Sequence, residues 1–160
     1  MDDRTQREIS PDLTAAERDV AREQLDNFNL GFAPPANPRE ISCALHDATG
    51  RLIGACFGTT AWNRLHVNVL WDHEDHRGDG AGARLLADAE TKARSAGCRY
   101  VTLHTFSFQA RGFYERRGYR VIFAQKTFLR DTRNICCARI SNRSQTKQDS
   151  LWTPNTSHWK

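Results

Sequence analysis

The spacing of apolar residues along the chain changes period several times, and these changes predict its helices and strands. Residues 12–30 carry apolar side chains at helical spacing behind Ser10-Pro11, a pair that is typical of a helix start. A second helical pattern covers residues 83–96 and stops at Gly97, a common C-terminal residue of helices. We therefore expect two amphipathic helices that lie far apart in the chain.

Three strand-like runs lie between these two helices. Residues 41–46 and 52–62 are joined by the turn residues 48–51, which predicts a β-hairpin. Residues 65–71 alternate in polarity and predict the third strand of an antiparallel meander. The apolar face expected for this strand consists of Leu65, Val67, Val69 and Trp71.

Beyond the second helix, the pattern alternates between strand and helix. Residues 100–106 predict a strand, and residues 109–117 predict a short helix that ends at Gly118. Residues 119–124 begin another strand, after which no clear period follows. An antiparallel meander that passes into strand–helix–strand units predicts a mixed α/β fold.

Length and composition describe an ordinary globular chain. With 160 residues, 39% hydrophobic and 26% charged, it is long enough for one domain with its own core. It contains no apolar run of membrane-spanning length and no signal-peptide pattern, so we expect a cytoplasmic protein. The five cysteines are odd in number and lack framework spacing, which favours buried free thiols over a disulfide scaffold.

The net charge of +4 comes from the C-terminal end of the chain. Residues 126–160 hold seven Lys/Arg and two Asp/Glu, whereas residues 1–125 hold 16 basic and 17 acidic side chains. This asymmetry indicates a solvated basic tail and argues against a nucleic-acid partner.

A glycine cluster stands between the predicted third strand and the second helix. Residues 77–82 read Arg-Gly-Asp-Gly-Ala-Gly, and this layout aims backbone N–H groups and a helix N-terminus at an anion. A Walker loop is excluded because no lysine follows the glycines. The spacing Gly78-x-Gly80-x-x-Ala83 matches a dinucleotide fingerprint, although residues 100–106 end without the acidic residue that binds ribose. A nicotinamide-dependent oxidoreductase is therefore one alternative.

Two motifs resemble those of the GNAT family of N-acetyltransferases. The glycine cluster is similar to the family's Gln/Arg-x-x-Gly-x-Gly/Ala loop, and residues 110–119, with Phe113-Tyr114 at their centre, are similar to its second signature. The resemblance extends from about residue 10 to residue 124. It implies a mixed central sheet with an N-terminal antiparallel meander, splayed central strands and flanking helices, and it implies acetyl-CoA as co-substrate without a metal.

The resemblance also assigns roles to residues of this chain. The loop amides would bind the pyrophosphate of CoA, and the splayed strand would pair with the pantetheine arm. The positions implied to bind the cofactor are Leu70, Trp71, Asp72, Arg77, Gly78, Asp79, Gly80, Ala81, Gly82, Ala83, Ser107, Ala110 and Phe113.

In the reaction that the resemblance implies, a primary amine of a small molecule attacks acetyl-CoA directly in a ternary complex. Tyr114 would protonate the departing thiolate, and backbone N–H groups near residues 69–71 would stabilise the oxyanion. The candidate bases are His66, Glu74 and His104. The expected partners are this amine and possible second copies in a homodimer, with no nucleic acid and no membrane.

The chain departs from the resemblance after Ala124, so the sequence predicts an acetyltransferase domain over residues 1–125 and an atypical tail over residues 126–160. The related bacterial subgroup continues with a Phe-Pro-Pro-Gly-His segment and a last strand. Codons for Phe128–Arg139, begun one base earlier, permit Phe-Pro-Pro-Gly-His-Thr-Gln-Tyr-Leu-Leu-Arg-Lys. Our hypothesis is a single-base shift that leaves a sheet edge unpaired and residues 145–160 disordered. A CoA-binding protein with little or no activity is the corresponding alternative.

Overall fold

The computed structural model describes residues 9, 11–127 and 131–140. They fall into two compact units, residues 1–36 and residues 37–160. The described part of the first unit contains one helix, α1 (Ala15–Asn29). None of the described helices in either unit is long and apolar enough to cross a membrane.

Helix α1 begins with a capping box. The Thr14 hydroxyl accepts a hydrogen bond from the Glu17 N–H, and the Glu17 carboxylate accepts one from the Thr14 N–H at 2.8 Å. Two of the N–H groups left without partners at the helix start are thereby satisfied. The predicted start at residue 12, after Ser10-Pro11, is therefore wrong by three residues.

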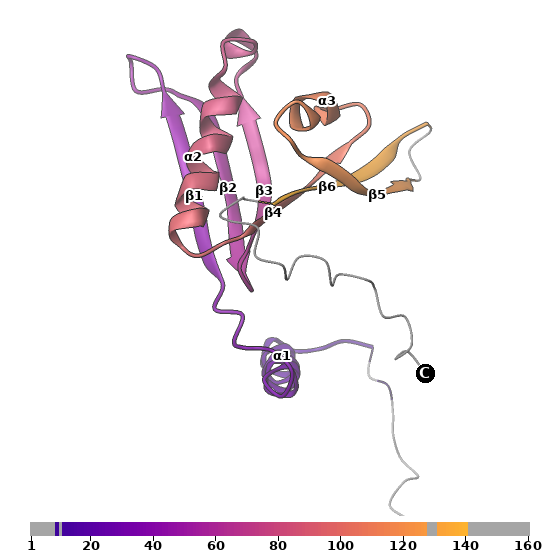
Figure 1. The fold of residues 1–160 in the computed structure, drawn as a ribbon. Helices are drawn as coiled ribbons and strands as arrows, with labels where there is room; N and C mark the ends of the chain where they lie inside the picture. The colour runs from indigo at the N-terminus through magenta and orange to yellow at the C-terminus, as the bar shows by residue number, and fades with distance from the viewer. Residues whose placement is uncertain (1–8, 10, 128–130, 141–160) are drawn as a thin grey trace, which may run out of the picture. The chain divides into compact units, whose positions relative to one another are not determined.

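The second unit is built on a six-stranded mixed sheet (Figure 1), which confirms the predicted α/β fold. The strands are β1 (Arg39–His46), β2 (Leu52–Ala61), β3 (Arg64–Asp72), β4 (Tyr100–Phe106), β5 (Arg120–Lys126) and β6 (Arg133–Ile140). Their spatial order is β1-β2-β3-β4-β6-β5, and every neighbouring pair is antiparallel except β3 and β4.

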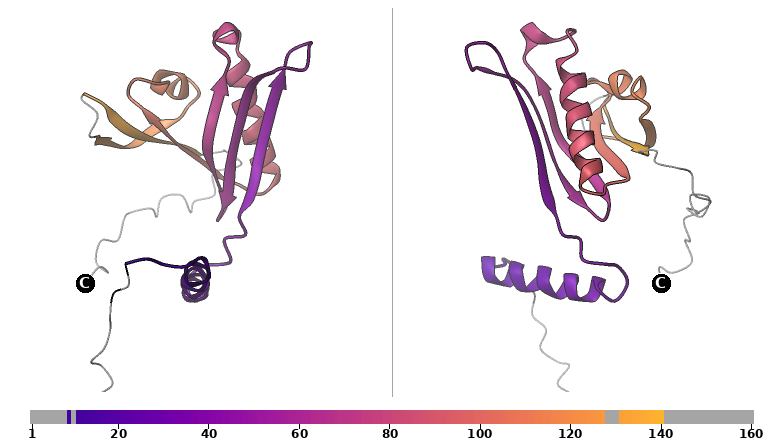
Figure 2. Two further views of the ribbon diagram at one scale, coloured as in Figure 1. Left: turned by 180° about the vertical axis from the view of Figure 1, so that it is seen from behind. Right: turned by 60° about the vertical axis from the view of Figure 1, so that its left-hand side comes forward.

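The described part of this unit also contains three helical elements: η1 (Glu74–His76), α2 (Ala81–Ser95) and α3 (Arg111–Glu115). Helix α2 lies along β1, β2 and β3, as Figure 2 shows from two sides. Its buried stripe includes Leu86 and Ala89, and it shares one core with Leu65, Leu103 and Ile135 of the sheet. We call the sheet face that packs on this core the inner face and the opposite one the outer face. Each fully buried leucine contributes about 1.5–3 kcal/mol to this packing.

The two central parallel strands pair over only part of their length. Strand β3 pairs with β4 from Arg64 opposite Tyr100 to Val67 opposite Leu103, and the pairing ends there. The predicted splay of the central strands is therefore confirmed. The backbone of residues 68–72 has no β4 partner, so its N–H and C=O groups on that side are free to bind another molecule.

A β-bulge in β3 reverses the faces predicted for its second half. Val67 and Val69 both have partners in β2, but Asn68 between them has none. This extra residue shifts the alternation by one position. Leu70 therefore packs on the core, whereas Val69 and Trp71, each 39% exposed, turn to the outer face. The prediction that these two share a face with Val67 is wrong for this reason.

The bulge depends on a close approach of two backbones. A Cβ atom on Gly58 of β2 would lie 2.1 Å from the carbonyl oxygen of His66 in β3. No side chain fits in that space, so only glycine allows β2 to approach the bulged strand here.

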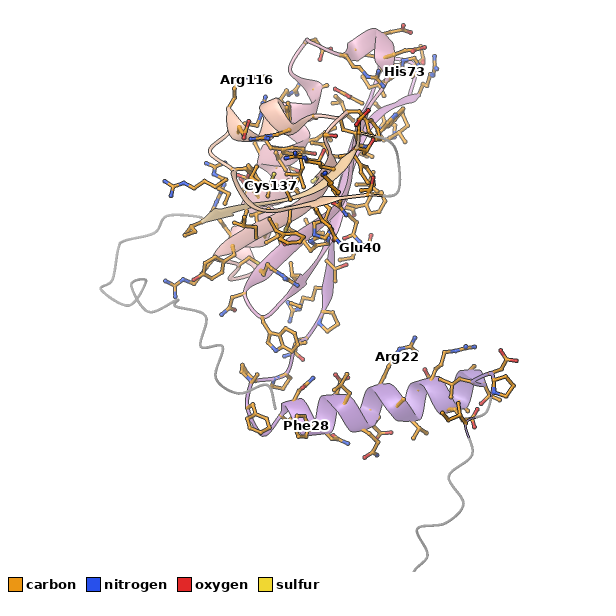
Figure 3. All side chains as sticks on the ribbon, turned by 90° about the vertical axis from the view of Figure 1, so that its right-hand side faces the viewer. Arg22, Phe28, Glu40, His73, Arg116 and Cys137 are labelled. Carbon is orange, nitrogen blue, oxygen red and sulfur yellow. The ribbon has the colours of Figure 1, made fainter. Side chains whose placement is uncertain are left out.

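Strand β6 corrects the expectation that the chain after residue 125 leaves the sheet edge unpaired. Residues 133–140 pair with β4 on one side and with β5 on the other. Ile135 and Cys137 are completely buried, and Figure 3 shows Cys137 inside the unit. The predicted disorder of residues 145–160 lies outside the described residues.

A buried carboxylate joins the last strand to α2. Glu90 accepts a hydrogen bond from the Tyr119 hydroxyl at 2.7 Å and forms an ion pair with Arg139 of β6 at 3.0 Å. Removing one partner of such a buried ion pair would leave the other charge buried without a partner. The contact between Glu90 and Arg139 therefore stabilises the packing of β6 on the core.

Candidate active site

The glycine cluster forms a tight loop that leads directly into α2. Gly78 and Gly80 have φ angles of +91° and +92°, in the left-handed region that favours glycine. Helix α2 begins at Ala81, two residues before the predicted Ala83, and Gly80 provides no side-chain cap. The N–H groups of Gly82 and Ala83 in the first turn therefore have no acceptor within the helix. They are free to donate hydrogen bonds to a bound anion.

Two carboxylates lie at this loop, one from Asp79 within it and one from Asp72 at the end of β3. Asp79 Oδ1 accepts a hydrogen bond from the Ala81 N–H at 2.8 Å. Asp72 Oδ2 lies 3.3 Å from the position that a Cβ on Gly82 would take, and Asp72 Oδ1 lies 3.8 Å from Arg77 Nε. An arriving phosphate group would thus meet two negative side chains and would compete with one of them for a backbone N–H.

Helix α3 contacts the start of α2 through Phe113. The Phe113 ring lies 3.7 Å from the position of a Cβ on Gly82, so a side chain at Gly82 would crowd the ring. Arg117 covers this ring, with its guanidinium carbon 3.6 Å from the ring centroid, and it donates a hydrogen bond to the Phe113 carbonyl at 3.0 Å. The sequence analysis missed Arg117, although its i+4 spacing from an aromatic residue on a short helix was a usable signal.

The Tyr114 side chain lies on the inner face and is only 7% exposed. Its ring packs edge-on against Phe113 and Tyr119. Burial, reinforced by the neighbouring Cys56 thiol, raises the pKa of Tyr114 to about 12. Its hydroxyl therefore keeps its proton near neutral pH, as a general acid must.

Two histidines lie on the outer face where the central strands separate. His66 Nδ1 is 3.0 Å from the Thr102 hydroxyl, and the His66 and His104 rings pack edge-on at 5.4 Å. Burial, followed by the nearby His104 and then Arg64, lowers the pKa of His66 below its usual 6.5. His104 follows Leu103, the last β4 residue paired with β3, so it stands at the fork.

The remaining predicted positions are spread around this arrangement. Glu74 is exposed in η1, beyond the end of β3, whereas His66 lies in the paired half of that strand. Ser107 Oγ accepts a hydrogen bond from the Arg133 N–H at 3.1 Å, and Ala110 is the residue before α3. The structure thus brings the loop, Phe113 and Tyr114 together on the inner side and the histidine pair on the outer side.

The histidines near the loop do not form a metal cluster. The His73 and His76 rings lie 6.2 Å apart, and Figure 3 shows His73 at the end of the sheet. Across the described residues, no group of three His, Cys, Asp or Glu side chains is arranged to hold a metal ion.

Residues 5–119 match the family described as the Acetyltransferase (GNAT) family. The chain belongs to this family. The match covers both motifs and the splayed strands, and it confirms the predicted family and enzyme class, an acyltransferase.

Two bacterial proteins have similar sequences. The blasticidin-S acetyltransferase of Streptomyces morookaense is 47% identical over 73 residues, which are 45% of this chain and 54% of that protein. The chain therefore matches only about half the length of this relative. The acetyltransferase Atu2258 of Agrobacterium fabrum is 32% identical over 115 residues, 71% of this chain and 84% of that protein.

Solved structures share the fold. An acetyltransferase from Bacillus cereus superposes with a TM-score of 0.77 at 26% identity, over 84% of this chain and 98% of that one. An aminoglycoside 6'-N-acetyltransferase complexed with coenzyme A gives a TM-score of 0.59 at 18% identity, over 79% and 94% of the two chains. At that identity, the second similarity concerns the fold alone.

Proposed function

We propose that this protein transfers the acetyl group of acetyl-CoA to a primary amine of a small molecule, by direct attack in a ternary complex. The observation that carries the proposal is the fork between β3 and β4, which opens beyond Val67 and Leu103. It leaves free strand backbone directly before the loop where α2 begins. A long, amide-rich cofactor that ends in phosphates matches this combination.

The cofactor would bind in two parts. Its pyrophosphate would lie on the amides of residues 77–83, where the helix N-terminus favours negative charge. Its pantetheine amides would pair with the free backbone of residues 70–72, as an additional strand does. Arg117, held over Phe113, would supply a positive charge near the phosphates.

The chemical step would use groups on both faces of the sheet. The amine nitrogen bonds to the thioester carbonyl carbon, and N–H groups near the bulge at Asn68 stabilise the oxyanion. The carbon–sulfur bond then breaks, and Tyr114 gives its proton to the sulfur, so the products are an amide and free CoA thiol. The proton lost from the nitrogen goes to His66.

The environment of His66 supports this role. In the tautomer whose Nδ1 donates to the Thr102 hydroxyl, Nε2 carries the lone pair that accepts a proton. The lowered pKa of His66 keeps the ring neutral at pH 7. Glu74 and His104 are the alternative bases, and unchanged kcat in both Glu74→Gln and His104→Asn would leave His66 as the candidate.

A small-molecule acceptor is supported by the Streptomyces relative, whose name gives blasticidin S as its substrate. The test is release of CoA thiol from acetyl-CoA with a panel of primary amines. We expect turnover with at least one amine and a loss of kcat in Tyr114→Phe, which removes the proton donor. Tyr100→Phe on the exposed part of β4 is the matched control.

Two outcomes would contradict this function. Binding of acetyl-CoA without turnover of any amine would favour a CoA-binding protein with little or no activity. Binding of NADH instead of acetyl-CoA, measured by calorimetry, would favour the nicotinamide-dependent alternative.

A further inference from the structure

The strands around the fork are poor in negative charge on the outer face. Within β3, β4 and the described residues of β6, the only carboxylate is Asp72. Its oxygen lies beside Gly82 of α2, on the inner side. The same strands carry Arg64, His66 and His104. An acceptor with several ammonium groups would find no carboxylate on the outer face of these strands to replace its lost hydration.

The same outer face carries aromatic side chains on both arms of the fork. The bulge turns Trp71 of β3 to the outer face, where it is 39% exposed. On β4, Val101, Leu103 and Thr105 are buried, so the alternation puts Phe106 on the outer face.

Phe106 extends this surface into the loop after β4. Its ring stacks on the Phe108 ring, with the centroids 5.3 Å apart and the planes 4° apart. Phe108 is 66% exposed, so one flat face of this pair is open in the described unit. Two parallel rings present a broad π surface next to the place where the strands separate.

Flat aromatic surfaces on strands that carry no outward carboxylate favour one class of ligand. A planar conjugated ring gains contact area and favourable ring geometry on such a surface, while a flexible polycation gains neither. We propose that the acceptor amine belongs to a molecule with a planar conjugated ring and at most one positive charge besides the reacting amine. The stacked pair Phe106–Phe108 and Trp71 bind that ring. This inference rests on the proposed function and specifies its acceptor.

The first experiment compares primary amines that differ in ring and charge. The probes are tryptamine and tyramine, which carry a ring and one amine, against spermidine and kanamycin, which are polycations. We expect kcat/KM to be at least about tenfold higher for the ring amines, in line with the energy of aromatic contacts. Equal or better turnover of the polycations would overturn the inference while leaving the proposed function intact.

Calorimetry with the CoA-bound protein keeps the inference testable without turnover. We expect the ring amines to bind more tightly than spermidine. Equal or weaker binding of the ring amines would contradict the inference, whatever the outcome for catalysis.

The second experiment changes the exposed ring itself. We expect Phe108→Leu to raise the KM of a ring amine about three- to tenfold and Phe108→Tyr to keep it, with the KM of acetyl-CoA unchanged in both. Tyr100→Leu is the matched control, because Tyr100 is 40% exposed and lies about 20 Å from Phe106 along the same strand. An identical KM in Phe108→Leu and Tyr100→Leu would overturn the assignment of the ring site.

Discussion

The guanidinium group of Arg117 lies face-on over the Phe113 ring, 3.6 Å from its centroid, and is held there by a hydrogen bond to the Phe113 carbonyl. Because the same ring faces Gly82 at the start of α2, a positive charge is fixed close to the glycine loop. Phe113 of α3 and Arg117 in the turn after this helix thus connect the second motif to the first.

Replacing this cation should weaken cofactor binding. We expect Arg117→Gln to raise the Kd of acetyl-CoA about tenfold, since loss of one charge-assisted contact costs roughly 1.4 kcal/mol. Calorimetry with acetyl-CoA and with acetyl-pantetheine, which lacks the phosphates, measures the effect. The control is Arg116→Gln, because Arg116 is exposed and the end of its side chain lies near Gly112, whereas Arg117 covers the Phe113 ring. An equal loss of affinity for acetyl-CoA and for acetyl-pantetheine would contradict a contact between Arg117 and the phosphates.

The loop carboxylate Asp79 should oppose the cofactor. An Asp79→Asn variant keeps an oxygen that can accept from the Ala81 N–H but removes the negative charge. We expect the Kd of acetyl-CoA to fall about two- to fivefold at low salt, the scale of a helix-terminus charge effect. This gain in affinity should decrease as the salt concentration rises, because salt screens the charge of Asp79. Asp75→Asn in η1 is the control, and a similar gain in both variants would indicate a long-range charge effect.

The pH dependence of kcat/KM should have an acid limb from His66. Burial lowers the pKa of this ring, so protonation below pH 6.5 removes the base and activity falls as the pH drops. The limb should be absent from the residual activity of His66→Asn. Burial raises the pKa of Tyr114 to about 12, so this group should cause no loss of activity on the alkaline side up to about pH 10. An acid limb that survives in His66→Asn would assign the base elsewhere.

Because two backbones approach closely at the bulge, we expect alanine substitutions at two glycines to change stability by different amounts. In Gly58→Ala the new Cβ would lie 2.1 Å from the His66 carbonyl oxygen, so β2 or β3 must move. We expect a loss of about 1–3 kcal/mol in the free energy of unfolding, the usual cost of overpacking. Thermal unfolding measures this loss. In Gly112→Ala the nearest atom is the flexible end of Arg116 at 3.3 Å, and alanine favours the helix, so stability should not fall.

The reading frame of the C-terminal segment can be checked directly. Our hypothesis requires the codons of Phe128–Arg139, begun one base earlier, to encode Phe-Pro-Pro-Gly-His-Thr-Gln-Tyr-Leu-Leu-Arg-Lys. Sequencing the gene decides this, and any other translation of that frame refutes the shift. The existing residues 133–140 still form β6, because Ile135 and Cys137 alternate into the core.

Local patterns were sufficient for most elements and for the glycine loop. Residues 100–106 form the predicted strand, and the glycine spacing marked the loop, because chain conformation there depends on the residues themselves. Strand β6 was not predicted, since its alternation is short and its partners come from elsewhere in the chain. The roles of all the predicted site residues, Glu74 and Ser107 among them, stay predictions, since their positions alone do not test them.

By itself, the sequence determined the order of helices and strands up to β5, the family motifs and the glycine loop, because periodicity and backbone freedom are local properties. Only the tertiary structure decided which face Trp71 occupies, since the bulge at Asn68 arises where β3 meets Gly58 of β2. It likewise decided that Arg117 covers Phe113 and that His66 meets His104. The contact between His66 and His104 depends on how two strands pack, and no local pattern encodes that packing. The spacing of Arg117 from Phe113 is local, but only the structure shows that this pair lies beside Gly82.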